Sequence, residues 1–304
     1  IKEAATIEVE GVLEENEKAP NGIEIRMETL RILSEPVDEM MPLAISKWKL
    51  NTSLEAKLNY RSIALRNVRE RAKFRIQEGL TRAFRDFLYS QGFTEIHTPK
   101  IGAKGAEGGA NIFKLEYFHR PAVLAQSPQF YKQMMVGVFD RVFETAPVFR
   151  AEKHNTKRHL NEYTSLDFEM GYIDGFEDIM AMETGYLQYA MELLEKEYTK
   201  ELKILGVTLP KVDKIPAVRF SEIKEKVAKK YQHKMRNPFD LEPEEEQLIS
   251  QYAKEEWGSD FVFVTHYPSK KRPFYAMDDP EDTRYTLSFD LLYKGMEITT
   301  GGQR

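Results

Sequence analysis

The feature that most constrains this chain is a run of charged residues between Pro147 and Met170, in which two strand-like segments flank a polar loop. Side chains two positions apart on a strand point to the same face. The spacing therefore places Arg150 and Glu152 together. The second segment presents four polar side chains on one face: Tyr163, Ser165, Asp167 and Glu169. Buried charges are costly unless paired or bound to a ligand, so the run favours a binding surface over a solvated hairpin, which remains the alternative.

These residue types together describe a surface that binds a nucleotide. Arginine presents a planar fork that suits phosphate oxygens. A glutamate can accept a hydrogen bond from an adenine amino group, a tyrosine can stack on a purine ring, and carboxylates can hold an ammonium group or Mg²⁺. The patterns GxxxxGK(S/T) and GxGxxG do not occur in the sequence, so the nucleotide would bind without a glycine-rich phosphate loop.

Composition limits the class of protein further. The chain has 304 residues, of which 41% are hydrophobic and 12% aromatic, which is typical of a globular protein. It contains no cysteine, which excludes disulfides and thiolate metal sites. No apolar run reaches the roughly 18 residues that span a bilayer and no signal-peptide pattern opens the chain, so we expect a cytoplasmic protein. The net charge of −5 gives no support for nucleic-acid binding, although a local basic patch would suffice.

The order of hydrophobic patterns predicts an α+β fold preceded by part of a small β-domain. Alternating segments at 4–13 and 23–32, joined by the turn Ala19–Gly22, predict a hairpin. Helical spacing begins near Asn67, and short strands and helices then alternate, which favours a domain built on an antiparallel sheet. The stretch 200–257 is highly charged, and we interpret it as a solvated surface insertion.

Two segments resemble motifs of the class II aminoacyl-tRNA synthetases. Phe149-Arg150-Ala151-Glu152 with Arg158-His159-Leu160-Asn161-Glu162 resembles motif 2, and Gly92–Pro99 resembles motif 1, the dimer element. The resemblance covers essentially the whole chain and implies an antiparallel β-sheet flanked by helices. It assigns three regions: 1–35 to the C-terminal part of an OB-fold that binds the anticodon, 36–66 to a hinge, and 67–304 to the catalytic domain.

The ends of the chain bear on this resemblance. The sequence opens at Ile1 inside a strand-like segment and stops at Arg304, and it has no match to motif 3, which carries another ATP-binding arginine in this family. We therefore expect a chain truncated at both ends, with motif 3 lying beyond Arg304.

The segment Gln126–Gln133 resembles the amino-acid pocket of aspartyl enzymes of the archaeal type. A lysine at position 132 supplies a positive charge that can pair with a side-chain carboxylate, whereas a neutral amide would leave this charge without a partner. The resemblance implies that Lys132 and Arg304 hold the β-carboxylate of L-aspartate. It also implies a mobile loop, Ala106–Gly109, whose Glu107 meets the α-ammonium group. It assigns further residues to the aspartate site: Ser127, Gln129, Asp167 and Tyr275.

The resemblance also implies how ATP is bound. Arg150 would bind the α-phosphate and stabilise its developing charge, as the catalytic residue. Glu152 would read the adenine ring, and Tyr163 would stack on it. His159 would lie near the γ-phosphate, and Arg158 would contribute to the same site.

Mg²⁺ on the ATP phosphates would be held, by the same resemblance, by Asp290, Glu297 and Thr300. Two carboxylates on facing strands are a reasonable site for a hard cation. The implied partners are L-aspartate, ATP and tRNA(Asp), with a homodimer formed through the motif 1 region and no association with membranes.

Several alternatives stay open. The same fold would suit an asparaginyl-tRNA synthetase or an asparagine-synthetase relative, and a non-catalytic RNA-binding paralogue would explain the missing motif 3. The hairpin loop Lys18–Gly22 carries a proline, which looks more like enzymes that charge both tRNA(Asp) and tRNA(Asn). Use of tRNA(Asn) is therefore a further hypothesis.

Overall fold

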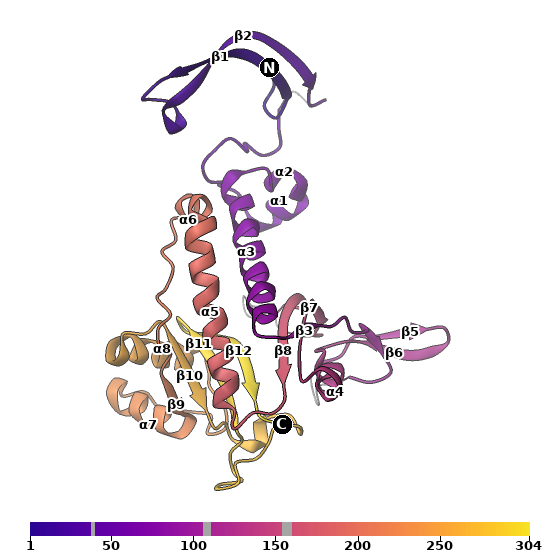
Figure 1. Cartoon of the computed structure of the whole chain (residues 1–304), viewed down its shortest axis with the longest axis vertical. Helices are drawn as coiled ribbons and strands as arrows, with labels where there is room; N and C mark the ends of the chain where they lie inside the picture. Colours follow the sequence, from indigo (N-terminus) through magenta and orange to yellow (C-terminus); the bar gives the residue numbers. More distant parts are fainter. Residues whose placement is uncertain (38–39, 106–110, 154–159) are drawn as a thin grey trace. The chain divides into compact units, whose positions relative to one another are not determined.

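The structure, a computed structural model shown in Figure 1, describes residues 1–37, 40–105, 111–153 and 160–304. By its internal contacts the chain forms two compact units, 1–75 with 200–206 and 76–199 with 207–304. Its sheets, in which most neighbouring strands are antiparallel, are flanked by helices, which confirms the predicted α+β class. No helix in the described segments is long and apolar enough to cross a membrane.

A long hairpin opens the first unit. β1 (Thr6–Glu15) pairs antiparallel with β2 (Ile23–Ser34) through the connection η1 (Pro20–Gly22), in which Asn21 adopts the left-handed conformation with φ 63°. No residue of either strand is buried. The alternating pattern predicted these strands, but their apolar side chains remain open to solvent in this unit.

Asn67 organises the rest of the first unit from a fully buried position. Its side-chain amide donates to the carbonyls of Ile45 and Lys47, at 3.0 and 2.6 Å. Its Oδ1 accepts from the backbone amide of Arg69 at 3.1 Å, so Asn67 caps helix α3 (Val68–Ser90) and ties the preceding linker to it. The other helices of this unit are α1 (Leu54–Asn59), α2 (Arg61–Ala64) and most of α6 (Thr199–Leu205).

In the second unit, the C-terminal part of α3 packs closely against α5 (Glu177–Glu197). A Cβ atom on Gly79 would lie 2.7 Å from Leu194 and 3.0 Å from Tyr198, so a larger residue would push the helices apart. The core around this contact is apolar and includes Ala83, Phe84, Leu88, Phe143, Ala190, Leu193 and Leu194.

Two separate sheets of the second unit carry the candidate site. The first has the order β3–β7–β8, and its strands are β3 (Thr94–Glu95), β7 (Arg141–Phe149) and β8 (Glu162–Met170). The second has the order β12–β11–β10–β9, and its strands are β9 (Ala217–Arg219), β10 (Phe261–Thr265), β11 (Ser288–Tyr293) and β12 (Met296–Gly302). Among the described strands, β8 and β12 are edges, and both line one cavity.

The stretch 200–257 differs from the solvated insertion that its charge led us to expect. It contains β9, α7 (Phe220–Tyr231) and α8 (Pro243–Trp257), and β9 pairs in parallel with β10. Apolar side chains spaced along these elements form a buried cluster with β10: Val218, Phe220, Ile223, Val227, Ile249, Ala253, Val262 and Val264. Charged residues on the outer helix faces conceal this period in the sequence.

A small sheet and a short helix lead into the site. The sheet has the order β4–β6–β5, formed by β4 (Ile101–Gly102), β5 (Lys114–Tyr117) and β6 (Arg120–Leu124). Helix α4 (Gln129–Phe139) follows, and its first turn carries two buried polar residues, Gln129 and Lys132.

Candidate active site

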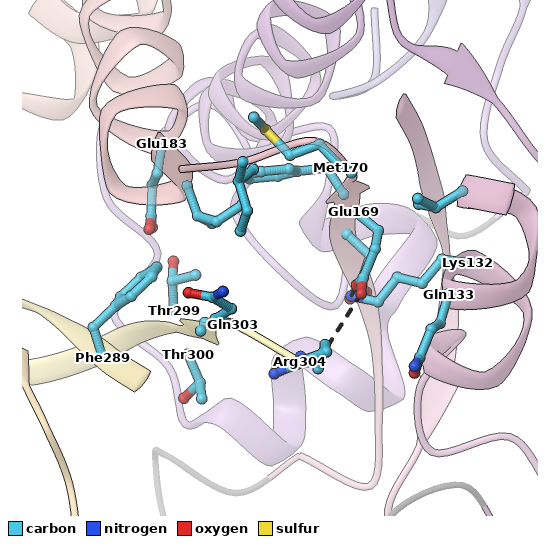
Figure 2. Close-up of a pocket in the computed structure, with 18 of the residues that line it drawn as sticks. Lys132, Gln133, Glu169, Met170, Glu183, Phe289, Thr299, Thr300, Gln303 and Arg304 are labelled. Carbon is cyan, nitrogen blue, oxygen red and sulfur yellow. Dashed lines mark hydrogen bonds and ion pairs between the residues drawn. The ribbon is translucent and has the colours of Figure 1, made fainter. Parts of the chain in front are cut away.

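Lys132 projects from α4 to a pair of carboxylates on β8. Its Nζ lies 2.9 Å from Asp167 Oδ1 and 3.5 Å from Glu169 Oε2, and the lysine is only 7% exposed. Figure 2 shows Lys132 beside Glu169. Burial opposes the charge on Lys132, but Asp167 and Glu169 outweigh it and raise the pKa of the lysine. Burial likewise opposes the charge on Asp167, and Lys132 with Ser165 holds the pKa of that carboxyl below its usual range. Both groups are therefore charged at neutral pH.

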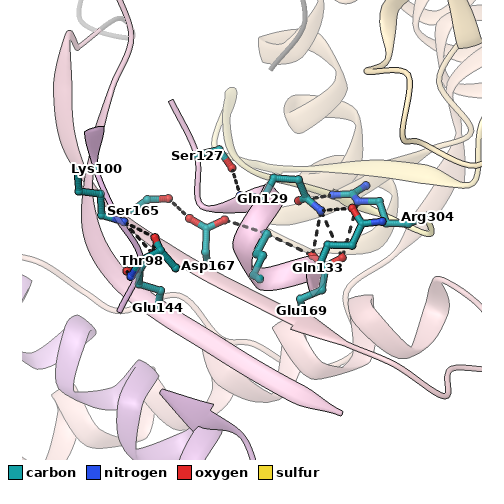
Figure 3. Close-up of polar contacts among 11 residues, drawn as sticks. Thr98, Lys100, Ser127, Gln129, Gln133, Glu144, Ser165, Asp167, Glu169 and Arg304 are labelled. Carbon is teal, nitrogen blue, oxygen red and sulfur yellow. Dashed lines mark hydrogen bonds and ion pairs between the residues drawn. The ribbon is translucent and has the colours of Figure 1, made fainter. Parts of the chain in front are cut away.

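Arg304 approaches the same carboxylates from the end of β12. Its Nε lies 4.0 Å from Glu169 Oε1, and its Nη2 donates to Gln129 Oε1 at 3.2 Å (Figure 3). The guanidinium carbon lies 4.5 Å from the centre of the Tyr275 ring. The structure thus places Lys132 and Arg304, the two cations expected at the aspartate site, on either side of Glu169.

Ser127 and Gln129 fix the start of α4 beside this cluster. The Oγ of Ser127 accepts from the backbone amide of Gln129 at 3.1 Å. The side chain of Gln129 donates towards Gln133 at 3.3 Å and Glu169 at 3.4 Å. Ser127 therefore supports the site through the helix, whereas Gln129 faces the charged groups directly.

A cavity of about 280 Å³ opens between β8 and β12 (Figure 2). Lys132, Asp167, Glu169 and Arg304 line one part of it, and Glu183 of α5 lines another. Burial, with a smaller contribution from Asp290, raises the pKa of Glu183 to about 7, against a hydrogen bond from Thr299 that lowers it.

The sequence analysis placed Glu169 on the polar face of a strand but assigned it no ligand, and it did not name Glu183. Glu169 lies two positions after Asp167 on the same face of β8, which was a usable signal for a shared site. Glu183 lies in an amphipathic helix and is brought to the cavity only by packing, so no local pattern indicates it.

The expected ATP residues lie where β7 ends. β7 stops at Phe149, so the prediction that Arg150 and Glu152 share a strand face is wrong. The backbone amide of Arg150 still extends the ladder by donating to the Asn161 carbonyl at 3.0 Å, but the amide of Glu152 then donates to the Arg150 carbonyl at 2.8 Å and turns the chain. The sequence pattern gave no sign of this turn.

Arg150 and Tyr163 come together at this end of the hairpin. The guanidinium carbon lies 5.8 Å from the centre of the Tyr163 ring. The Nε atom of Arg150 is buried without a hydrogen-bond partner in the described part of the chain, so it has a donor to offer to a ligand. The charge of Arg150 also contributes to lowering the pKa of Asp167, which links Arg150 electrostatically to the cluster around Lys132.

The three residues expected at Mg²⁺ meet on the other sheet. Asp290 of β11 lies directly opposite Thr300 of β12. The Thr300 Oγ1 lies 2.8 Å from Asp290 Oδ1 and 2.7 Å from Glu297 Oε1. Burial and the neighbouring Asp290 raise the pKa of Glu297 to about 7. Two carboxylates and a hydroxyl fit Mg²⁺, which commonly takes one or two protein carboxylates and completes its shell with phosphate oxygens and water.

Some expected residues lie outside the described part of the structure. These are Glu107 with the rest of the predicted loop Ala106–Gly109, and the two ATP residues Arg158 and His159. Within the described residues there is no group of three or more histidine or acidic side chains that could hold a metal by themselves.

Comparison with known proteins defines the class to which this fold and site belong. The family model "tRNA synthetases class II (D, K and N)" matches residues 53–304, and the chain belongs to this family. Within it, the chain is 48% identical to a protein of Deinococcus radiodurans named aspartate--tRNA(Asp/Asn) ligase, over 99% of this chain and 70% of that protein. Further relatives, 39–45% identical, are named aspartate--tRNA(Asp/Asn) or aspartate--tRNA(Asp) ligases.

The fold of this chain is similar to the folds of solved structures. A putative aspartyl-tRNA synthetase from Leishmania major superposes with a TM-score of 0.88 at 31% identity, covering 100% of this chain and 68% of that one. An asparaginyl-tRNA synthetase from Pyrococcus horikoshii, complexed with asparaginyl-adenylate, superposes with a TM-score of 0.87 at 28% identity, covering 96% and 66%. The asparaginyl enzyme is thus more distant in sequence than the aspartate ligases.

Proposed function

We propose that this chain belongs to an aspartate–tRNA ligase, which activates L-aspartate with ATP and transfers it to the 3′ end of tRNA(Asp). The observation that carries the proposal is the pair of cations, Lys132 and Arg304, placed around Glu169 in one cavity. The names of the relatives that are 39–48% identical support the same amino acid.

The charges of the site suit aspartate better than asparagine. A side-chain carboxylate would take over from Asp167 and Glu169 as the partner of Lys132, whereas an amide would leave part of that charge uncompensated. The carboxylates would then be free to receive the α-ammonium group, together with Gln129. The second cation, Arg304, is held in reach by its contact with Tyr275.

The first chemical step would be attack of the aspartate α-carboxylate on the α-phosphorus of ATP, with pyrophosphate as the leaving group. The protein forms no covalent bond in this step, so positioning and charge stabilisation dominate. Arg150 would stabilise the charge on the α-phosphate, and Tyr163 would stack on the adenine ring. Asp290, Glu297 and Thr300 would hold Mg²⁺, which neutralises charge on the phosphates.

Amino-acid-dependent ATP–pyrophosphate exchange tests this proposal. We expect exchange with L-aspartate and at least about 100-fold less with L-asparagine at equal concentration, because the neutral amide cannot replace the carboxylate between two cations. Preferred exchange with asparagine would establish the asparaginyl alternative. Absence of exchange with either amino acid, in an enzyme that still binds tRNA, would establish the non-catalytic paralogue.

A second candidate is a relaxed enzyme that also charges tRNA(Asn). It is favoured by the relative from Deinococcus radiodurans, whose name includes both tRNAs. The hairpin connection Pro20–Gly22 is the part of the chain that would distinguish the two anticodons.

We also propose a cytoplasmic homodimer formed through the motif 1 elements, α3 and β3. Sedimentation equilibrium on the enzyme tests the oligomeric state, and a single species of monomer mass at micromolar concentration would contradict it.

A further inference from the structure

Arg272 contacts Asp290 in the acidic pair, Asp290 and Glu297, that we assign to Mg²⁺. No role was predicted for Arg272 from the sequence. Its Nη2 lies 2.8 Å from Asp290 Oδ1. The guanidinium carbon lies 3.9 Å from the centre of the Tyr267 ring, and the side chain is only 11% exposed. Its Nε atom has no hydrogen-bond partner among the residues that the structure describes. A cation is therefore already present where a divalent cation is expected.

The loop that carries Arg272 is attached to the residues that follow β12. Arg272 ends the short helix η2 (Ser269–Lys271), and its amide donates to the Ser269 carbonyl at 3.3 Å. Farther along, the amide of Met277 donates to the Gln303 carbonyl at 2.9 Å, next to β12. Tyr275 of the same loop contacts Arg304. The loop thus contributes a residue to each of the two proposed sites: Tyr275 to the aspartate site and Arg272 to the acidic pair.

The contacts of Asp290 show what this cation does. Asp290 Oδ1 lies 2.8 Å from both Arg272 Nη2 and Thr300 Oγ1, so this oxygen already has two partners. Glu297 has the Thr300 hydroxyl at 2.7 Å. A free divalent ion would therefore have to displace the guanidinium and would gain only two carboxylates. An ion that arrives with ATP also brings phosphate oxygens as ligands.

We propose that Arg272 is a positioning residue that holds the Asp290 carboxylate and offsets its charge, so that the acidic pair binds a divalent ion tightly only together with ATP. The inference rests on the proposed assignment of Asp290, Glu297 and Thr300 to Mg²⁺. When ATP enters, the phosphates would take up the positive charge of Arg272, and Asp290 would become available to the metal.

Binding of Mn²⁺ to the enzyme without ATP, measured from the electron paramagnetic resonance signal of the free ion, tests the proposal. Arg272→Met removes the charge and keeps apolar contact with Tyr267. We expect it to lower the Kd for Mn²⁺ by about tenfold, because one positive charge within a few ångströms of the metal is lost. Arg272→Lys keeps the charge and should remain near the wild type. In the presence of a non-hydrolysable ATP analogue, the wild type should gain more affinity for Mn²⁺ than Arg272→Met.

Arg284 provides a matched control in the same loop. It pairs with Asp282 at 2.7 Å and lies over the Tyr285 ring, but its side chain is 80% exposed. Arg284→Met should leave the Kd for Mn²⁺ unchanged. If Arg272→Met does not fold by circular dichroism, Arg272→Gln removes the same charge and takes its place in the comparison.

The variant Glu297→Gln separates this inference from the metal assignment on which it rests. If Glu297→Gln leaves Mn²⁺ binding intact, the assignment and the inference both fail. If Glu297→Gln abolishes binding but the neutral variants at 272 bind Mn²⁺ no more tightly than Arg284→Met, the assignment stands and the role of Arg272 is refuted.

Discussion

At the scale of single residues, each of the two cations of the site lies close to a carboxylate of the same chain. Lys132 neutralises Asp167 at 2.9 Å, and Arg304 approaches Glu169 at 4.0 Å. Buried ion pairs contribute little net stability, because desolvation offsets attraction, but removing one partner leaves the other charge uncompensated. The pairs therefore position the two cations, for the carboxylate ligand that we propose, at small cost in stability.

Substitution of Lys132 tests this arrangement in the enzyme. Lys132→Met should raise the KM for aspartate by about 100-fold and change the KM for ATP by less than about threefold, because the proposed function assigns the lysine to the aspartate side chain. Steady-state ATP–pyrophosphate exchange measures both constants. Lys226→Met, at an exposed lysine of α7, is the control. Equal increases in the two KM values would show that Lys132 has no specific role towards aspartate.

The stability of the folded chain should depend on pH through Glu183, because this carboxyl group is buried. Burial raises the pKa of Glu183 to about 7, well above the value of an exposed glutamate, so the folded chain binds this proton more tightly than the unfolded chain. The stability that this protonated group contributes is present below about pH 4.5 and is lost as the pH rises through about 7.

Urea unfolding of the chain at pH 5 and pH 8 measures this effect. Glu183→Gln cannot ionise, so the wild type should lose more stability than the variant over this range, by on the order of a few kcal/mol. Parallel changes in the free energy of unfolding of the two proteins would show that Glu183 is ionised in the folded chain throughout.

The sequence singled out Lys132, Asp167 and Arg304, which line one cavity in the structure, but it did not indicate the contact between Arg272 and Asp290. Lys132, Asp167 and Arg304 belong to short motifs in which residue type and spacing are both informative. Arg272 comes from an irregular loop and reaches Asp290 across the end of a sheet. Such a contact depends on the path of the loop, which no periodic pattern encodes.

At the scale of elements, the segment after β3 is fixed to β7 by a buried carboxylate. Glu144 of β7 is 2% exposed, and it accepts from the backbone amide of Thr98 at 2.6 Å and from its hydroxyl at 2.8 Å (Figure 3). Lys100 adds an ion pair to the same carboxylate at 2.8 Å. These contacts continue where the strand pairing ends, because β3 pairs with β7 over only two residues.

Loss of this carboxylate should be costly. Glu144→Ala would leave the Thr98 amide and the Lys100 ammonium without their partner, and we expect it to lower the free energy of unfolding by about 3 kcal/mol. Glu222→Ala, which breaks the exposed pair with Lys226 on α7, should cost less than about 0.5 kcal/mol. Urea denaturation compares the two variants, and similar costs would mean that the Glu144 contacts are not specific to the fold.

Helices and strands with a clear hydrophobic period were predicted well. Segments whose backbone bonds to a side chain instead of a neighbouring strand were not. Apolar spacing indicated the helix that begins beside Asn67, which is α3, and both strands of the N-terminal hairpin. Within Gly92–Pro99, the segment that resembles motif 1, only Thr94–Glu95 forms a strand, since the amide of Thr98 bonds to the Glu144 side chain instead of a neighbouring strand. Local patterns do not reveal such competition between backbone and side-chain partners.

At the scale of the whole molecule, the residues proposed for the activation of aspartate and the hairpin proposed to select the tRNA belong to different units. Those residues proposed for ATP, aspartate and Mg²⁺ that the structure describes lie in the unit formed by 76–199 and 207–304, whereas the N-terminal hairpin lies in the other unit. Formation of aspartyl-adenylate requires no tRNA in the proposed mechanism. A change in the hairpin should therefore alter the choice of tRNA without altering the activation of aspartate.

Pro20 at the hairpin connection tests this separation. Proline fixes its own φ, so Pro20→Ala would loosen the connection that also contains the left-handed Asn21. If the enzyme charges tRNA(Asn), we expect Pro20→Ala to lower kcat/KM for tRNA(Asn) relative to tRNA(Asp) by about fivefold to tenfold, which corresponds to roughly 1 kcal/mol of added discrimination against tRNA(Asn). Aspartate-dependent ATP–pyrophosphate exchange should remain at the wild-type rate. Charging of purified tRNA(Asp) and tRNA(Asn) with radiolabelled aspartate measures the ratio. An equal fall for both tRNAs together with slower exchange would mean that the hairpin acts on the catalytic unit, and the division of tasks would then be wrong.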